Sequence, residues 1–121
     1  MTLAEETRWM DAVDQAALVA KAEVTPLELL EAAIERIERI DPELNAVVMR
    51  WYDHAREVAA DPELPDGPFR GVPFLLKDLF TNYAGQTLSN GNAALRGAAV
   101  VGRLPISGLF VRPAMTSPAA L

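Results

Sequence analysis

The chain has 121 residues, half of them hydrophobic and 23% charged, a balance typical of one globular domain and not of a disordered chain. It has no cysteine, which excludes disulfides and thiolate chemistry, and its 11 basic and 17 acidic residues give a net charge of −6. Because phosphate-backbone binding depends on Lys and Arg, we expect no nucleic acid partner.

The charges are distributed unevenly along the chain. Residues 1–78 hold all 17 acids and eight bases, whereas residues 79–121 hold three arginines and no acid. Three scattered arginines are too few for a nucleic-acid surface. They also divide the apolar stretches into pieces well short of the roughly 18 residues that a membrane span needs, and the acidic start of the chain is unlike a secretory signal. We therefore expect a cytoplasmic protein with no membrane partner.

A first helix is predicted over residues 7–22, because apolar side chains recur there at helical spacing. We expect the face from Trp9 through Val13 to Ala20 to be buried. The second helix has clearer signals, since Thr25, Pro26 and Glu28 form a capping sequence in which Thr25 is the N-cap.

This second helix is expected to end at Ile40, because Asp41-Pro42 follows. Its spacing predicts a buried face facing the core, with charged residues on the opposite side. The residues of that face are Leu27, Leu30, Ala33, Ile34, Ile37 and Ile40.

Strand and helix then alternate in the predicted elements. Residues 45–49 are a short run that favours a strand, and residues 53–60 favour a helix. Residues 61–68 contain three prolines and a glycine, which indicates a surface loop. Residues 71–80 form an apolar run typical of a strand buried on both faces. This order predicts an α/β fold.

Lys77 is the residue at which chemistry is most plausible. At the solvated end of a strand its amine is an ordinary surface charge, whereas in an interior position desolvation disfavours the ammonium form and makes the amine a base. We expect it at the end of a central strand with its amine mostly buried. Its neighbour Asp78 would point to the opposite face if the strand continues that far.

Three segments together resemble the amidase signature family. They are residues 25–37 (TPLELLEAAIERI), 41–48 (DPELNAVV) and 71–78 (GVPFLLKD), in the family's order and spacing. The likeness covers roughly residues 8–97, and it looks closer to stand-alone amidases than to the amidotransferase subunit that acts on charged tRNA. It implies an N-terminal part of the amidase signature fold, in which helices pack on part of a mixed sheet.

The resemblance also implies a catalytic role for Lys77, as the base of a Ser-cisSer-Lys triad. In the family a neutral lysine accepts a proton from a relay serine, and the relay serine takes the proton of the nucleophilic serine. The nucleophilic serine then forms an acyl-enzyme. Both serines belong to a Gly-Gly-Ser-Ser-Gly-Gly-type loop. This chain has no such sequence, and its serines are Ser89, Ser107 and Ser117.

The likeness ends within the last part of the chain. We expect residues 1–97 to form the N-terminal part of an amidase domain and residues 98–121 to form an irregular, divergent tail, because prolines interrupt it and no apolar stripe is present. A truncated or frame-shifted gene product would account for such a tail. A genuine C-terminal extension is the alternative.

Other residues are interpreted as structural. Ser89 lies in a turn-like sequence, Ser89-Asn90-Gly91-Asn92, and Trp51-Tyr52 are expected to pack on or beside the core. His54 is the only histidine, which is too few for a metal site, and we expect it at the surface. No glycine spacing matches a phosphate-binding loop, so we expect neither a metal nor a cofactor.

Two classes of function remain open. The first is hydrolysis of amide bonds in a small-molecule substrate, with this chain carrying the base and inactive alone. The second is a non-catalytic remnant that binds a partner or associates with itself through exposed apolar surface. A fragment of a glutamyl-tRNA amidotransferase-like subunit is a further alternative.

Overall fold

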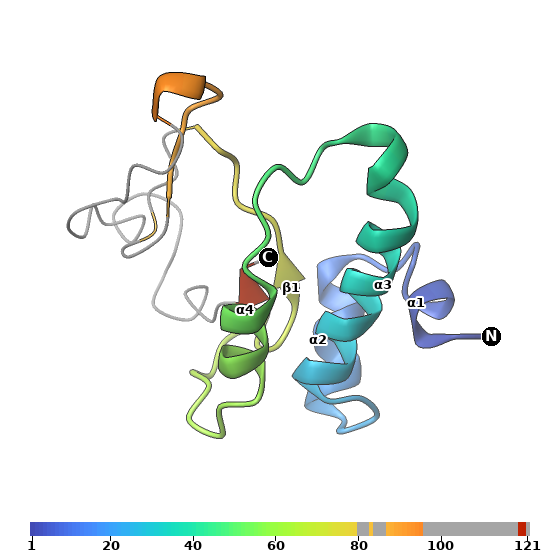
Figure 1. The fold of residues 1–121 in the computed structure, drawn as a ribbon. Coiled ribbons are helices and arrows are strands. Elements are labelled where there is room, and N and C mark those ends of the chain that lie inside the picture. The colour runs from blue at the N-terminus through green and yellow to red at the C-terminus, as the bar shows by residue number, and fades with distance from the viewer. Residues whose placement is uncertain (80–82, 84–86, 96–118, 121) are drawn as a thin grey trace. The chain divides into compact units, whose positions relative to one another are not determined.

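The computed structural model describes residues 1–79, 83, 87–95 and 119–120. The chain divides into two compact units, the first containing residues 1–74 and 113–121 and the second containing residues 75–112. In the first unit are four helices and two strands, namely α1 (Leu3–Glu6), α2 (Ala12–Ala20), α3 (Pro26–Leu44), α4 (Tyr52–Ala59), β1 (Pro73–Phe74) and β2 (Ala119–Ala120) (Figure 1). In the second unit, residues 75–112, the described part contains the 3₁₀ helix η1 (Ala93–Leu95). No helix in the described ranges has the length and apolar character needed to cross a membrane.

The helix predicted over residues 7–22 is confirmed only for its later part, because α2 spans Ala12–Ala20 and residues 7–11 are turn and irregular backbone. Helix α2 begins only after Asp11, whose carboxylate accepts the Asp14 N–H at 2.9 Å as an N-cap. The predicted buried face is wrong. Trp9 is 84% exposed and Val13 is 63% exposed, and no residue of α2 is buried.

Thr7 is the C-cap of helix α1 and is held by side-chain hydrogen bonds. The Thr7 hydroxyl donates to the Leu3 carbonyl at 2.8 Å. The Arg36 guanidinium, on α3, donates to Thr7 Oγ1 at 2.7 Å and to the Ala4 carbonyl at 2.9 Å. Thr7 and Ala4 are each only 1% exposed, so this arginine joins α1 to α3 through buried acceptors.

The start of α3 confirms the predicted cap. The Thr25 N–H donates to Glu28 Oε2 at 2.7 Å, and the Glu28 N–H donates to Thr25 Oγ1 at 3.2 Å. The buried residues of α3 include Leu30, Ala33 and Ile34 as predicted, but Leu27 and Ile40 are exposed. The prediction did not include Leu29 and Ala32, which are also buried.

Helix α3 continues past its predicted end at Ile40 and contains Pro42 within its last turn. The helix ends instead at Asn45, whose backbone is left-handed (φ 50°) and whose N–H donates to the Asp41 carbonyl at 2.7 Å. The Asp41 carboxylate accepts the N–H groups of Ala46 and Val47 at 2.7 and 3.0 Å. The strand predicted at residues 45–49 is therefore absent, because these donors bind Asp41 and not a partner strand.

The core of the first unit lies between α3 and α4. The predicted helix at residues 53–60 is confirmed to within one residue by α4, which packs on α3. The buried cluster consists of Leu30, Ala33, Ile34, Ala55 and Ala59, with Ile37 and Tyr52 packed against it. At the surface, the Arg56 guanidinium binds the Glu31 carboxylate at 2.6 and 3.1 Å and connects the same two helices.

The strand predicted over residues 71–80 is reduced to β1, and its predicted burial on both faces is wrong. Val72 is buried, but Phe74 is 36% exposed and Leu75 is 57% exposed. Strand β1 pairs in parallel with β2, with Pro73 opposite Ala119. Because only two residues have a partner, only two form a strand.

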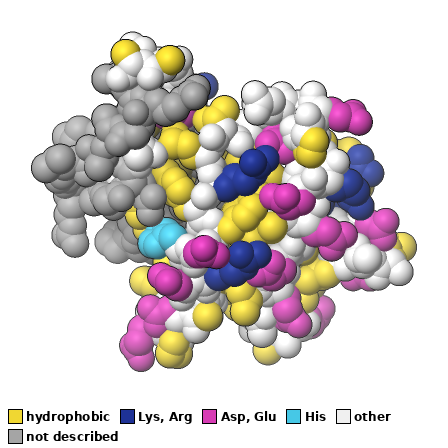
Figure 2. Space-filling model, in the orientation of Figure 1, with side chains coloured by type: hydrophobic (Ala, Val, Ile, Leu, Met, Phe, Trp, Pro, Cys, Tyr) yellow, Lys and Arg dark blue, Asp and Glu magenta, His cyan; other side chains and the backbone are white. Residues whose placement is uncertain are grey.

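The predicted irregular tail differs from the structure at residues 119–120, which form β2. Residues 98–118 and 121 lie outside the described part of the chain. The predicted loop at residues 61–68 is confirmed as turns and irregular backbone. Figure 2 shows acidic side chains spread over the visible face, with Lys and Arg among them.

Candidate functional site

Lys77 lies in the second unit, three residues after the end of β1. The expectation that it ends a central strand with a buried amine is wrong in this structure, because the residue is exposed and its backbone is irregular. The physical reason is the short strand: since β1 ends at Phe74, no ladder carries the chain at residue 77 into an interior.

The neighbouring residue, Asp78, is fixed by hydrogen bonds. Its Oδ1 accepts the backbone N–H groups of Ser89 at 2.7 Å and Asn90 at 3.1 Å. Its Oδ2 accepts the Gly91 N–H at 3.2 Å and the Ser89 hydroxyl. One carboxylate thus gathers four donors from three consecutive residues. We call Asp78 with Ser89, Asn90 and Gly91 the Asp78 clamp.

The predicted turn at Ser89 is confirmed. The Asn92 N–H donates to the Ser89 carbonyl at 2.8 Å, and both central residues, Asn90 and Gly91, have positive φ (51° and 69°), as in a type I′ turn. Left-handed backbone at successive residues directs neighbouring N–H groups toward one point, which suits an anion. Here the anion is the side chain of Asp78.

The clamp also determines the charge state of Asp78. The Ser89 hydroxyl and then the Ser89 N–H, with smaller contributions from Gly91 and Asn90, hold the pKa of the Asp78 carboxyl below its ordinary value. An ionised carboxylate with four donors is an acceptor and not a general acid. Its role at this place is therefore to hold the backbone rather than to transfer a proton.

The contact between Asp78 and Ser89 is not predicted by the sequence. The turn sequence predicts Ser89 as a turn residue, and strand alternation predicts Asp78 on the face opposite Lys77 if the strand continues that far. The two residues are 11 apart, and no periodic pattern joins positions at that distance. The available signal was a Ser-Asn-Gly turn downstream of an aspartate in an otherwise apolar segment.

Metal binding has little support in the described part of the chain. No group of three or more His, Asp or Glu side chains there is placed to hold an ion. His54 lies in α4 and is half-buried. Tyr52, which begins the same helix, packs against the core as expected.

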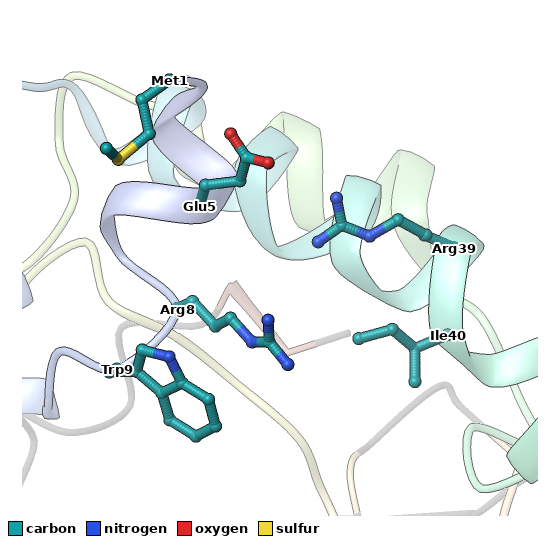
Figure 3. Close-up of a pocket in the computed structure, with 6 residues that line it drawn as sticks. All are labelled: Met1, Glu5, Arg8, Trp9, Arg39 and Ile40. Carbon is teal, nitrogen blue, oxygen red and sulfur yellow. The ribbon is translucent and has the colours of Figure 1, made fainter.

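An open pocket of about 500 Å³ lies on the first unit (Figure 3). Its lining consists of Met1, Glu5, Arg8, Trp9, Arg39 and Ile40. The Arg8 guanidinium stands 4.7 Å from the centre of the Trp9 ring, a cation–π distance. Among the described residues, the lining contains no serine or lysine, so these residues offer none of the nucleophile and base chemistry considered for Lys77.

Comparison with known proteins identifies the family. The model of the amidase family matches residues 28–106, a segment that contains both Lys77 and the Asp78 clamp. The chain therefore belongs to the amidase family. The match continues past residue 97, where we expected the likeness to end.

Individual relatives agree with this assignment. The chain is 48% identical over 71 residues to a 6-aminohexanoate-cyclic-dimer hydrolase of Pseudomonas sp. (strain NK87), covering 59% of this chain and 14% of that protein. It is 33% identical over 120 residues to an acylamidase of Rhodococcus erythropolis, covering 88% and 25%.

A solved structure agrees in fold. A bacterial aryl acylamidase of the amidase signature family superposes with a TM-score of 0.70 at 41% identity, over 75% of this chain and 20% of that one. This structural neighbour is an amidase signature enzyme, and the likeness supports the predicted α/β class for this chain. The chain spans a quarter or less of the length of each of these proteins.

Proposed function

We propose that this chain forms the base-bearing N-terminal part of an amide hydrolase that acts on small-molecule amides, with Lys77 as the base. The observation that carries the proposal is the family match over residues 28–106, which includes Lys77 in its Gly71 to Asp78 segment. The 41% identity to an aryl acylamidase supports the same chemistry.

The chemistry proposed for Lys77 is proton transfer. A neutral lysine amine would accept a proton from the hydroxyl of a relay serine, and the relay serine would take the proton of the nucleophilic serine. The oxygen of the nucleophilic serine would then attack the amide carbonyl and form an acyl-enzyme. A neutral amine is favoured where solvent is excluded. Because Lys77 is exposed in this chain, the proposal requires it to be covered in the active enzyme by segments like those that make up the rest of the relatives.

The proposed architecture follows from the same family match. Helices α3 and α4 would cover part of a mixed sheet to which β1 contributes, with residues 1–97 as the N-terminal part of the amidase domain. Helix α3 does contact β1, and β1 has a parallel partner in β2. Because the family match continues to residue 106, the divergent part would be confined to residues 107–121.

A chimera tests the function. The segment of the aryl acylamidase that aligns with this chain is replaced by this chain's residues, and hydrolysis of a chromogenic anilide is measured. We expect the chimera to be active and Lys77→Ala to lower kcat by about 10²–10⁴-fold, the usual worth of a general base. Lys77→Arg should not restore it, because a guanidinium stays protonated.

The matched control is Lys21→Ala, which removes the chain's other lysine, an exposed residue 4.0 Å from Glu23. It should leave kcat unchanged. A folded chimera that hydrolyses the anilide equally well without Lys77 would refute the base, and a folded chimera with no activity would favour a non-catalytic remnant.

A further inference from the structure

We infer that Asp78 is a positioning residue for Lys77, which it fixes through the backbone by binding the turn at Ser89 to Gly91. The inference rests on the proposed role of Lys77 and adds a residue to it. It is carried by the four hydrogen bonds of the Asp78 clamp.

The clamp restricts Asp78 strongly. An aspartate side chain has only two rotatable bonds, so a carboxylate whose two oxygens are both held also fixes its own Cα atom closely. The Cα of Lys77 lies one trans peptide, about 3.8 Å, from that atom. The same four bonds therefore restrict the position of the Lys77 Cα, and with it the region that the lysine side chain can reach.

Asp78 does not act here as a counter-ion of Lys77. Within the described residues no ion pair joins the Lys77 amine to the Asp78 carboxylate, whose oxygens face the turn instead. A lysine that must work as a base gains from this arrangement, because an adjacent carboxylate bound to its amine would favour the ammonium form. The clamp uses the carboxylate for donors of the turn, and among the described residues it makes no ion pair with the Lys77 amine.

Competitive acylation of the 121-residue chain tests the inference without any enzyme activity. The chain has two lysines, Lys77 and Lys21, so trace labelling with acetic anhydride followed by peptide mass spectrometry gives the ratio of their reactivities at each pH. Lys21 lies in the other unit and serves as an internal reference.

Two variants separate positioning from simple charge. Asp78→Asn removes the charge and weakens the clamp, whereas Ser89→Ala removes one bond and keeps the charge. Because the amine is the nucleophile and its access to the reagent depends on where the backbone places it, we expect both variants to change the Lys77 to Lys21 ratio of the parent chain by about twofold or more. The matched control is Asp53→Asn, a 99% exposed carboxylate on α4, which should leave the ratio unchanged.

The remaining outcomes oppose the inference. A ratio that is the same in all four proteins means that the clamp does not influence Lys77. A change in Asp78→Asn alone means that only the charge matters and that positioning is absent. Circular dichroism of the helices and the absolute reactivity of Lys21 show whether the first unit remains folded in each variant. Neither result affects the Lys77→Ala measurement in the chimera, so the two proposals fail independently.

Discussion

Ala22 occupies a backbone position for which glycine is the usual choice. It follows α2 with φ 56°, its N–H donates to the Val19 carbonyl, and the Glu23 N–H donates to the Leu18 carbonyl, both at 3.0 Å. These two bonds define a Schellman motif, in which the left-handed residue is most often Gly. An alanine there retains the steric cost of the left-handed region.

Ala22→Gly should therefore stabilise the chain. We expect a gain of about 0.5–1 kcal/mol in the free energy of unfolding, because the steric strain is released at a smaller cost in chain entropy. Urea unfolding followed by circular dichroism measures it. The matched control is Ala20→Gly, inside the last turn of α2, which should lose about 0.5–1 kcal/mol. A loss of stability in Ala22→Gly would contradict the argument.

Gly71 presents the opposite case, a position that only glycine fits. Its φ is +82°, and an added Cβ would lie 2.7 Å from Pro26 Cγ and 3.0 Å from Pro26 Cβ. Gly71→Ala should cost about 2–4 kcal/mol, the sum of left-handed strain and overpacking. Gly91→Ala, at φ +69° with nothing within 4 Å, should cost about 1 kcal/mol. Equal losses in urea unfolding would show that the contact with Pro26 is unimportant.

For single residues, the sequence predicts the hydrogen bonds that join positions close together in the chain. The capping box at Thr25 and Glu28 and the turn at Ser89 were both predicted, because each depends on residues at most three apart. The clamp on Asp78 and the bond from Arg36 to Thr7 were not, because their partners are 11 to 13 and 29 residues away. Nothing local distinguishes these side chains from ordinary surface charges.

Among the elements, the end of α3 depends on one carboxylate. Asp41 is 4% exposed. The Val47 N–H, then the Ala46 N–H and the Arg50 guanidinium, hold its pKa below the ordinary value. Helix α3 continues through Pro42. The N–H groups of Ala46 and Val47 are bound to the Asp41 carboxylate, so they do not take part in the strand predicted at residues 45–49. A local β-branched run was thus overruled by a charged side chain a few residues before it.

The pH dependence of stability follows from the sign of this shift. A carboxyl with a lowered folded pKa stabilises the fold above its unfolded pKa of about 3.9, and that contribution is lost as the pH falls through the folded pKa. Asp41→Asn should therefore be less stable than the parent chain at pH 5–7, and the difference should shrink below about pH 4. Urea midpoints at pH 7, 5 and 3 measure it.

The control for this series is Asp53→Asn, whose 99% exposed side chain should change stability little at any of the three pH values. A difference between Asp41→Asn and the parent chain that is as large at pH 3 as at pH 7 would show that the ionised carboxylate is not the source of the stabilisation.

For the whole molecule, the sequence predicted the family and the segment that carries Lys77, because three motifs occur in register. It predicted a mostly buried Lys77 amine, whereas the residue is exposed in the structure. Burial of a residue after β1 depends on which segments pack over it, and β1 obtains its described partner from residues 119–120, far along the chain. The functional proposal therefore depends on the family assignment and on the segment from Gly71 to Asp78. The exposure of Lys77 depends on the packing of distant segments and has to be taken from the structure.

The 121-residue chain by itself should show no measurable amidase activity. It offers a candidate base, but the nucleophile and relay loop of the family does not occur in its sequence, and in serine hydrolases loss of the nucleophile costs on the order of 10⁶ in kcat. Absent oxyanion donors cost roughly 10²–10³ each. The assay is hydrolysis of a chromogenic anilide by the purified chain, beside Lys77→Ala and Ser89→Ala. Ser89 is a poor nucleophile because the carboxylate that accepts its hydroxyl proton, that of Asp78, has a lowered pKa and is a weak base. Turnover above background that both substitutions abolish would show that Ser89 does serve as the nucleophile, and the proposed division of roles would have to be abandoned.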